Sequence, residues 1–128
     1  MKILLDTHTA LWWVNDYEKL PMTARELILD EANTLYISVV SMWEVAIKAS
    51  IGKLLEFNGG AGAFIAKVDL LPVHLVTIAP RHAGTVENLP FIHRDPFDRM
   101  LIAIAKTDNM TILTADENIH KYDVSSMW

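Results

Sequence analysis

The sequence predicts an α/β fold in which a central, mostly parallel sheet lies between helices, a three-layer α/β/α sandwich. Two observations carry this prediction. Short apolar runs typical of buried strands alternate with longer runs of helical periodicity. Such alternation implies right-handed crossovers, which place helices on both faces of the sheet. The predicted strands are residues 3–5, 35–39, 73–78 and 111–113, with a further short strand near Val124.

Seven helices are expected between these strands, over residues 8–14, 22–32, 42–50, 61–70, 80–87, 97–108 and 117–121. The glycine-rich segment 58–63 is interpreted as a turn before a helix. It lacks the third glycine of a dinucleotide-binding loop and the Gly-Lys-Ser/Thr of a phosphate-binding loop. No internal repeat, low-complexity tract or long linker divides the sequence, so we expect a single domain over residues 1–128.

Hydropathy and cysteine content exclude several classes of protein. The mean hydropathy is +0.22, yet no apolar run approaches the roughly 18 residues that a membrane-spanning helix needs. Asp6 and His8 interrupt the apolar start before a signal-peptide core of about 7–15 residues can form. We therefore expect a cytoplasmic protein with no membrane partner. Because the chain has no cysteine, any metal would need oxygen or imidazole ligands.

The net charge of −5 argues mildly against a protein that binds nucleic acid, because phosphate contacts usually come from a basic face. A cluster of four acids would account for most of this charge, and a bound divalent cation would offset part of it locally. The high content of hydrophobic residues, 52%, suggests that a partner or a second copy covers some apolar surface.

Two acids lie near the ends of the first two predicted strands. Asp6 ends the run Ile3-Leu4-Leu5, where it would either cap the next helix or project from the carboxyl edge of the sheet. Glu44 lies three residues after Ser41, a spacing that satisfies the capping-box pattern. Capping and metal binding therefore compete for the Glu44 side chain, whereas Ser41 is predicted to cap under either interpretation.

Two further acids lie in later helix starts. Asp95 stands before a proline suited to the first helical position, so it takes the cap and leaves Asp98 in the first turn. Thr114 and Glu117 form a second capping-box pattern, in which Thr114 caps and Asp116 is the spare acid. A first-turn dipole contribution of about 0.3–1 kcal/mol is the structural alternative to a functional role for Asp98 and Asp116.

The four acids share one predicted location, because each lies at the carboxyl end of a strand or at a neighbouring helix start. Four carboxylates in one crevice would repel one another at neutral pH unless a cation joined them. An all-oxygen site suits Mg²⁺ or Mn²⁺. The proposed ligands are Asp6, Glu44, Asp98 and Asp116.

Four ordered segments, spread over nearly the whole chain, together resemble the PIN-domain ribonucleases, in particular the toxins of bacterial toxin–antitoxin pairs. They are residues 3–8 (ILLDTH), 41–48 (SMWEVAIK) with 52–54 (GKL), 94–103 (RDPFDRMLIA) and 112–116 (ILTAD). The resemblance implies a parallel sheet sandwiched by helices, a Mg²⁺ or Mn²⁺ site and cleavage of single-stranded RNA. It also implies a homodimer that a cognate antitoxin protein holds inactive.

Residue by residue, the resemblance implies that Asp6, Glu44 and Asp98 are the three principal acids of the family and that Asp116 is its less regular fourth. Thr7, Ser41 and Thr114 match small polar positions that support those acids. His8 departs from the asparagine or serine that many members carry after the Asp-Thr pair. We interpret His8 as a neutral hydrogen-bond donor beside the acids.

Arginine and tryptophan residues could also contact RNA. Arg94 and Arg99 flank Asp98 and would meet either RNA phosphates or nearby acids in exposed ion pairs. The tryptophans lie within apolar runs at helical spacing, which favours core or interface positions over base stacking. They are Trp12, Trp13, Trp43 and Trp128.

Three alternatives from other classes stay open. A phosphatase of the haloacid-dehalogenase type needs a second aspartate two residues after Asp6, where this chain has His8. A receiver module, which serves signalling, needs paired acids after the first strand, an aspartate after the third and a late lysine, and only Asp6 fits. The third alternative is a non-catalytic module of the same fold that binds a partner through its apolar surface. Such a module would leave single-stranded RNA intact in the presence of Mg²⁺, whereas a nuclease would cut it.

Overall fold

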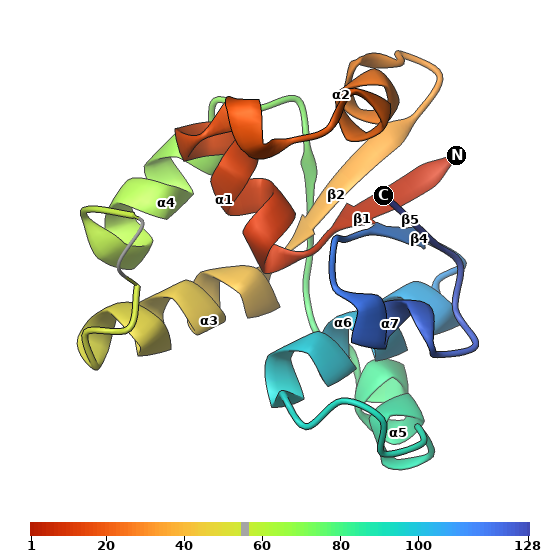
Figure 1. Ribbon diagram of the computed structural model, residues 1–128. Helices are drawn as coiled ribbons and strands as arrows, with labels where there is room; N and C mark the ends of the chain where they lie inside the picture. The colour runs from red at the N-terminus through yellow and green to blue at the C-terminus, as the bar shows by residue number, and fades with distance from the viewer. Residues whose placement is uncertain (55–56) are drawn as a thin grey trace.

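A computed structural model describes residues 1–54 and 57–128 and has a five-stranded, all-parallel sheet at its centre (Figure 1). The strand order across the sheet is β3-β2-β1-β4-β5. The strands are β1 (Lys2–Leu5), β2 (Thr34–Ser38), β3 (His74–Val76), β4 (Thr111–Leu113) and β5 (Ser126–Met127). The predicted class, a parallel sheet sandwiched by helices, is therefore confirmed.

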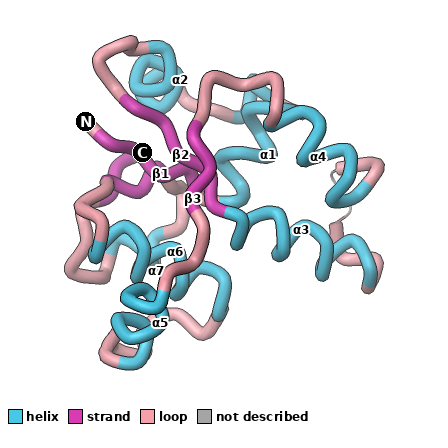
Figure 2. Tube along the Cα trace, turned by 180° about the vertical axis from the view of Figure 1, so that it is seen from behind, coloured by secondary structure: helices cyan, strands magenta, loops and turns pink. Residues whose placement is uncertain are grey.

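Helices cover both faces of this sheet (Figure 2). They are α1 (Thr7–Asn15), α2 (Met22–Leu29), α3 (Val39–Ser50), α4 (Gly60–Val68), α5 (Pro80–Glu87), α6 (Pro96–Thr107) and α7 (Glu117–His120), with a 3₁₀ turn, η1, over Tyr17–Lys19. Alternation along β1 explains the two layers. Ile3 and Leu5 join the core under α1, α2 and α4, whereas Leu4 joins the core under α5, α6 and α7.

The register of the central strands brings three chain turns to one edge. Leu5 of β1 pairs with Ile37 of β2 and with Leu113 of β4, so these strands end at the same level. The chain order reverses between β1 and β4, because β2 and β3 lie on one side of β1 while β4 and β5 lie on the other. Sites in open parallel sheets form at such a reversal, outside the carboxyl ends of the strands.

Some predicted boundaries were wrong. The segment 73–78 forms a strand only over His74–Val76, and the last strand forms at Ser126–Met127 instead of near Val124. The helix predicted over 42–50 begins at Val39, because Ser38 ends β2 and its Oγ accepts a hydrogen bond from Val40 N at 3.1 Å. The second helix ends at Leu29, before the predicted limit of residue 32.

The tryptophans occupy different environments. Trp12 and Trp128 pack together with ring centres 5.7 Å apart, and both lie against the α1 side of the core with Trp13. Trp43 is 57% exposed and meets the edge of Phe97. Trp43 is therefore not a core residue. Of the two predicted positions, core and interface, only an interface fits its exposure. Among the described residues, no helix is both long and apolar enough to cross a membrane.

Candidate active site

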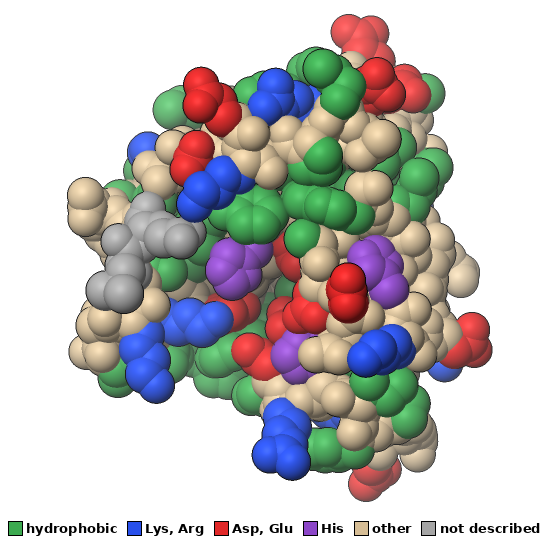
Figure 3. Space-filling view, viewed as in Figure 1, with side chains coloured by type: hydrophobic (Ala, Val, Ile, Leu, Met, Phe, Trp, Pro, Cys, Tyr) green, Lys and Arg blue, Asp and Glu red, His purple; other side chains and the backbone are tan. Residues whose placement is uncertain are grey.

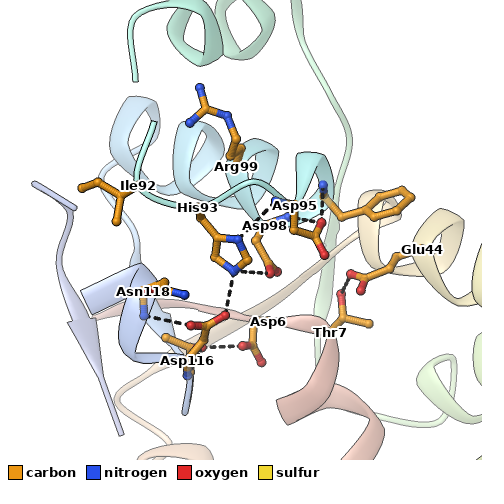
Figure 4. Close-up of polar contacts among 12 residues, drawn as sticks. Asp6, Thr7, Glu44, Ile92, His93, Asp95, Asp98, Arg99, Asp116 and Asn118 are labelled. Carbon is orange, nitrogen blue, oxygen red and sulfur yellow. Dashed lines mark hydrogen bonds and ion pairs between the residues drawn. The ribbon is translucent and has the colours of Figure 1, made fainter. Parts of the chain in front are cut away.

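Acidic side chains gather in a hollow on the face where the carboxyl ends of the central strands open (Figure 3). Histidine and basic side chains surround this hollow in the space-filling view. The acids come from four places in the chain: the end of β1, α3, the first turn of α6 and the start of α7. Figure 4 shows how these side chains point toward one another.

Asp6 is buried at the end of β1 and caps α1, as one of the two sequence interpretations predicted. Its Oδ1 accepts a hydrogen bond from Thr9 N at 2.8 Å, and its Oδ2 accepts one from the Thr114 hydroxyl. Burial raises the pKa of Asp6, although the hydrogen bonds from Thr114 and Thr9 act in the opposite direction. Capping and a place in the acid cluster are therefore compatible for this residue.

Glu44 is buried in α3, and its carboxylate does not reach back to a cap amide. Its Oε1 lies 2.6 Å from the Thr7 hydroxyl, and its Oε2 pairs with Lys48. Ser41 Oγ lies 2.9 Å from Thr7 Oγ1. A carboxylate can only accept, so the Thr7 hydroxyl donates its one proton to Glu44. The Ser41 hydroxyl then donates to the Thr7 oxygen. The predicted capping box was wrong, since Ser38 caps this helix and Ser41 lies inside it.

Lys48 is a positive charge that the sequence interpretation overlooked. Burial lowers the pKa of this amine, but the hydrogen bond and charge of Glu44, with the charges of Asp95 and Asp98, outweigh burial and raise it. Lys48 therefore stays protonated at neutral pH and offsets one of the four acids. The cluster is less strongly anionic than the four carboxylates alone would make it.

Asp98 projects from the first turn of α6 toward the end of β4. Asp95 caps this helix as predicted, and its Oδ1 accepts hydrogen bonds from Phe97 N at 2.8 Å and Asp98 N at 3.3 Å. Burial, followed by the charges of Asp95, Glu44 and Asp6, raises the pKa of Asp98 to about 7. Its carboxylate is thus held where a negative charge is unfavourable without a cation.

Asp116 was predicted to be a spare acid, but it is the cap of α7. Its Oδ1 accepts a hydrogen bond from Asn118 N at 2.8 Å. Thr114, the predicted cap, instead donates to Asp6 and accepts from Asp116 N at 3.0 Å. Burial raises the pKa of Asp116, but hydrogen bonds from His93 and Asn118 outweigh it and lower the pKa overall. The threonine links two of the four acids.

His93 lies between two of the acids and was missed in the sequence interpretation. Its Nε2 is 2.8 Å from Asp116 Oδ2 and 3.0 Å from Asp98 Oδ2 (Figure 4). Its Nδ1 accepts a hydrogen bond from Asp95 N at 3.2 Å, so the ring proton of a neutral imidazole belongs on Nε2. His93 is therefore oriented to donate to Asp116, and the Asp98 carboxylate lies within ion-pair distance of the same nitrogen. The available signal was a histidine just before the Asp95 cap, which no periodic pattern marks.

Arg99 does not face the acids or the solvent. It is 8% exposed, and its guanidinium donates to the carbonyls of Val86, Leu89 and Pro90 and to the hydroxyl of Tyr122. That hydroxyl also accepts from His93 N at 2.8 Å. Both predicted alternatives for this arginine, phosphate contact and exposed ion pairing, were therefore wrong. Its contacts fix the loop that carries His93.

His8 is exposed, and its ring lies 5.8 Å from that of Trp12. Burial raises the pKa of Asp6, and the charge of His8 lowers it by less than burial raises it. Arg94 is also exposed, next to the Asp95 cap.

The donor set fits a hard divalent cation. Among the described residues, carboxylate oxygens of Asp98 and Asp116 lie within 4.8 Å of each other, and a ring nitrogen of His93 lies in the same cluster. Asp6 adjoins this group through Thr114, while Glu44 lies across the hollow with Thr7 (Figure 4). Bringing a cation to the buried carboxylates would relieve the repulsion that raises the pKa of Asp98. Oxygen ligands of this kind suit Mg²⁺ or Mn²⁺.

The chain matches a known family of domains. Residues 3–125 match the family model described as PIN domain. The chain therefore belongs to the PIN domain family, and the haloacid-dehalogenase-type and receiver alternatives are removed.

Comparison with individual proteins gives relatives over nearly the whole chain. The chain is 28% identical over 123 residues to ribonuclease VapC22 of Mycobacterium tuberculosis, covering 94% of this chain and 91% of that protein. Among solved structures, it resembles the VapBC2 complex of Rickettsia felis bound to a promoter DNA fragment (TM-score 0.73, 16% identity, 99% and 98% coverage). It also resembles DNA-bound VapBC of Salmonella typhimurium (TM-score 0.69, 17% identity, 99% and 97% coverage). These structural likenesses concern the fold.

Proposed function

We propose that residues 1–128 form a single nuclease domain that cleaves single-stranded RNA internally with Mg²⁺ or Mn²⁺, as the toxin of a toxin–antitoxin pair. The observation that carries the proposal is the gathering of acids at the strand-order reversal of a PIN fold. Asp98 and Asp116 lie in one cluster, Thr114 links Asp6 to Asp116, and the charges of Glu44 and Asp6 act on Asp98. The likeness to a protein named ribonuclease VapC22 supports RNA as the substrate.

Different side chains would hold the cation, orient its ligands and offset charge. Asp6, Asp98 and Asp116 would hold it, with Glu44 completing the site from α3. When bound, the cation would lower the pKa of a coordinated water and stabilise negative charge on the phosphodiester. Thr114 keeps the Asp6 carboxylate oriented, and Thr7, itself in contact with Ser41, does the same for Glu44. Lys48 offsets charge at the Glu44 side of the hollow.

The proposed partners are RNA, a cognate antitoxin protein and a second copy of this chain. Solved structures of similar fold are VapBC complexes, which supports an antitoxin as partner. Exposed apolar side chains near the hollow offer surface for such contacts, since Trp43 is 57% and Ile47 is 41% exposed. We propose the cytoplasm as the place of action, where RNA and a neighbouring antitoxin would both be available.

The test incubates end-labelled single-stranded RNA with the protein in Mg²⁺, with and without EDTA, and sequences the product ends. Asp98→Asn should abolish cleavage and leave the circular dichroism spectrum unchanged, because it keeps the side-chain volume and removes the charge. Asp123→Asn is the matched control, since Asp123 is a fully exposed aspartate whose nearest ion pair is with Lys106. Full activity of folded Asp98→Asn, or intact RNA with the parent protein and Mg²⁺, would refute the proposal.

A further inference from the structure

A cavity of about 380 Å³ opens beside the acids, between α1, α3 and the chain before α4. Thr7 and Glu44 line it, so it is continuous with the proposed catalytic hollow. Its volume is near the lower end of the roughly 300–1,000 Å³ that enclose small organic ligands. That is room for one small organic unit, and a folded segment would not fit.

The walls of this cavity differ in chemistry. Leu11, Trp12 and Phe57 supply apolar and aromatic surface. The charged side chains of the lining are three lysines and two acids, and Lys48 pairs with Glu44 while Lys19 pairs with Asp16. Lys53 is the third lysine, so the lining carries one positive charge in excess. The His8 ring, 5.8 Å from that of Trp12, is exposed at the same cavity. An aromatic wall beside ammonium groups is the combination with which proteins hold single-stranded nucleic acid, by stacking bases and by attracting phosphates. Within the part of the chain that the structure describes, Lys53 has no ion pair, and a purely apolar peptide would not supply one.

Resting on the proposed RNA cleavage, we propose that this cavity binds the nucleotide next to the scissile phosphate. Its base lies against the Trp12 and His8 rings, and its phosphate lies by Lys53. This arrangement bears on the objection that a chain of net charge −5 binds RNA poorly, because the cavity lining has one more lysine than it has acids. The cavity would also contribute to the choice of cleavage sequence, since the base is enclosed there.

Binding of a short fluorescein-labelled single-stranded RNA tests this proposal. The full chain carries Asp98→Asn, so that the RNA is not cut, and affinity is measured at several salt concentrations. Adding Lys53→Gln should weaken binding and reduce the slope of log affinity against log salt by about 0.7, the value for one phosphate contact of a single strand. Adding His8→Ala should lower affinity by about tenfold, as loss of a stacking partner does.

Lys106→Gln is the matched control, because Lys106 is an exposed lysine at the far end of α6 from Asp98. It should change neither the affinity nor the salt slope. Cross-linking of 4-thiouridine RNA to the same protein, mapped by mass spectrometry, should label the peptide that contains His8 and Trp12. Cross-links confined to other peptides would overturn the proposal, even where binding is too weak to titrate.

The outcomes separate this inference from the proposed function. If the parent protein cleaves RNA while Lys53→Gln and His8→Ala keep normal affinity, the nucleotide site is wrong and the nuclease assignment stands. If the variants lose affinity only for an antitoxin peptide, the cavity is a protein-binding site and the proposal is overturned. If the parent protein leaves RNA intact with Mg²⁺, the proposed function itself fails.

Discussion

Replacing His93 by alanine should weaken binding of Mn²⁺ by about 10- to 100-fold, the usual effect of removing a group that orients a metal-binding carboxylate. In the structure, His93 Nε2 lies 2.8 Å from Asp116 Oδ2, to which it donates, and 3.0 Å from Asp98 Oδ2, while Nδ1 accepts from Asp95 N. The ring therefore joins the start of α6 to the start of α7. Without it, Asp116 loses a hydrogen-bond donor, Asp98 loses a polar neighbour, and Asp95 N loses its acceptor.

The assay is calorimetric titration of the protein with Mn²⁺ in the absence of RNA. His93→Gln should recover part of the affinity, because its amide N–H can donate to Asp116. His74→Ala is the control, since His74 is an exposed histidine on the edge strand β3 whose ring contact is with Tyr36. Unchanged Mn²⁺ affinity in folded His93→Ala would refute the positioning role.

A spectroscopic readout separates donation from coordination. With Nδ1 facing the Asp95 amide, Nε2 carries the proton and is unsuited to bind a cation. Electron spin echo spectra of the Mn²⁺-loaded protein should therefore lack nitrogen coupling from an imidazole. A nitrogen coupling that disappears in His93→Ala would show that His93 is a metal ligand and that the assigned tautomer is wrong.

Four further outcomes are expected. A hundredfold excess of Mn²⁺ over its Kd should stabilise the fold by about 2.7 kcal/mol and raise the melting temperature by roughly 5–15 °C, a shift that shrinks in Asp98→Asn. In chelator, the free energy of unfolding should fall as pH rises from about 4 to 7 and then level off. The reason is that folded Asp98, with its pKa raised to about 7, keeps a proton that the unfolded chain releases. Urea titrations of Asp98→Asn should show a smaller slope, since the raised pKa of Asp6 contributes in the same direction. Ser38→Ala should cost about 1 kcal/mol of stability in urea titration as a lost cap, and no loss there would contradict the assigned start of α3. Arg99→Met should cost roughly 3 kcal/mol, because it leaves the carbonyls of the 86–90 segment without a donor, and near-parent stability would show that water replaces the guanidinium.

Much of the fold could be predicted from the sequence because it depends on short-range periodicity. The apolar runs at residues 3–5 and 111–113 are too short and too apolar for surface helices, and both form central strands. The edge strands were less well predicted. β3 is mostly exposed, so its sequence carries little signal of burial. Only three of the six residues predicted as this strand pair with β2 and form it.

Candidate acids could be placed for the same reason, but their contacts could not. Asp6 follows a strand, and the Asp95-Pro96 pair marks a helix start, so both positions are visible in one dimension. Which residue caps α3 and α7 depends on where β2 and β4 end in the sheet. β2 extends to Ser38, which caps α3 and leaves Ser41 to bond with Thr7. β4 ends at Leu113, and Thr114 bonds with Asp6.

The sequence by itself determined the layered fold, the strands that carry the site and the acids at their ends, because periodicity and strand-to-helix turns are local properties. The Glu44–Lys48 pair, at i,i+4 in α3, was also open to prediction from residue spacing. Only the tertiary structure decided that His93 lies between Asp98 and Asp116. The partners of His93 lie 5 and 23 positions along the chain, and its loop is held by Arg99 and Tyr122. Such contacts follow from the path of an aperiodic loop over the packed sheet, which no spacing of residues encodes.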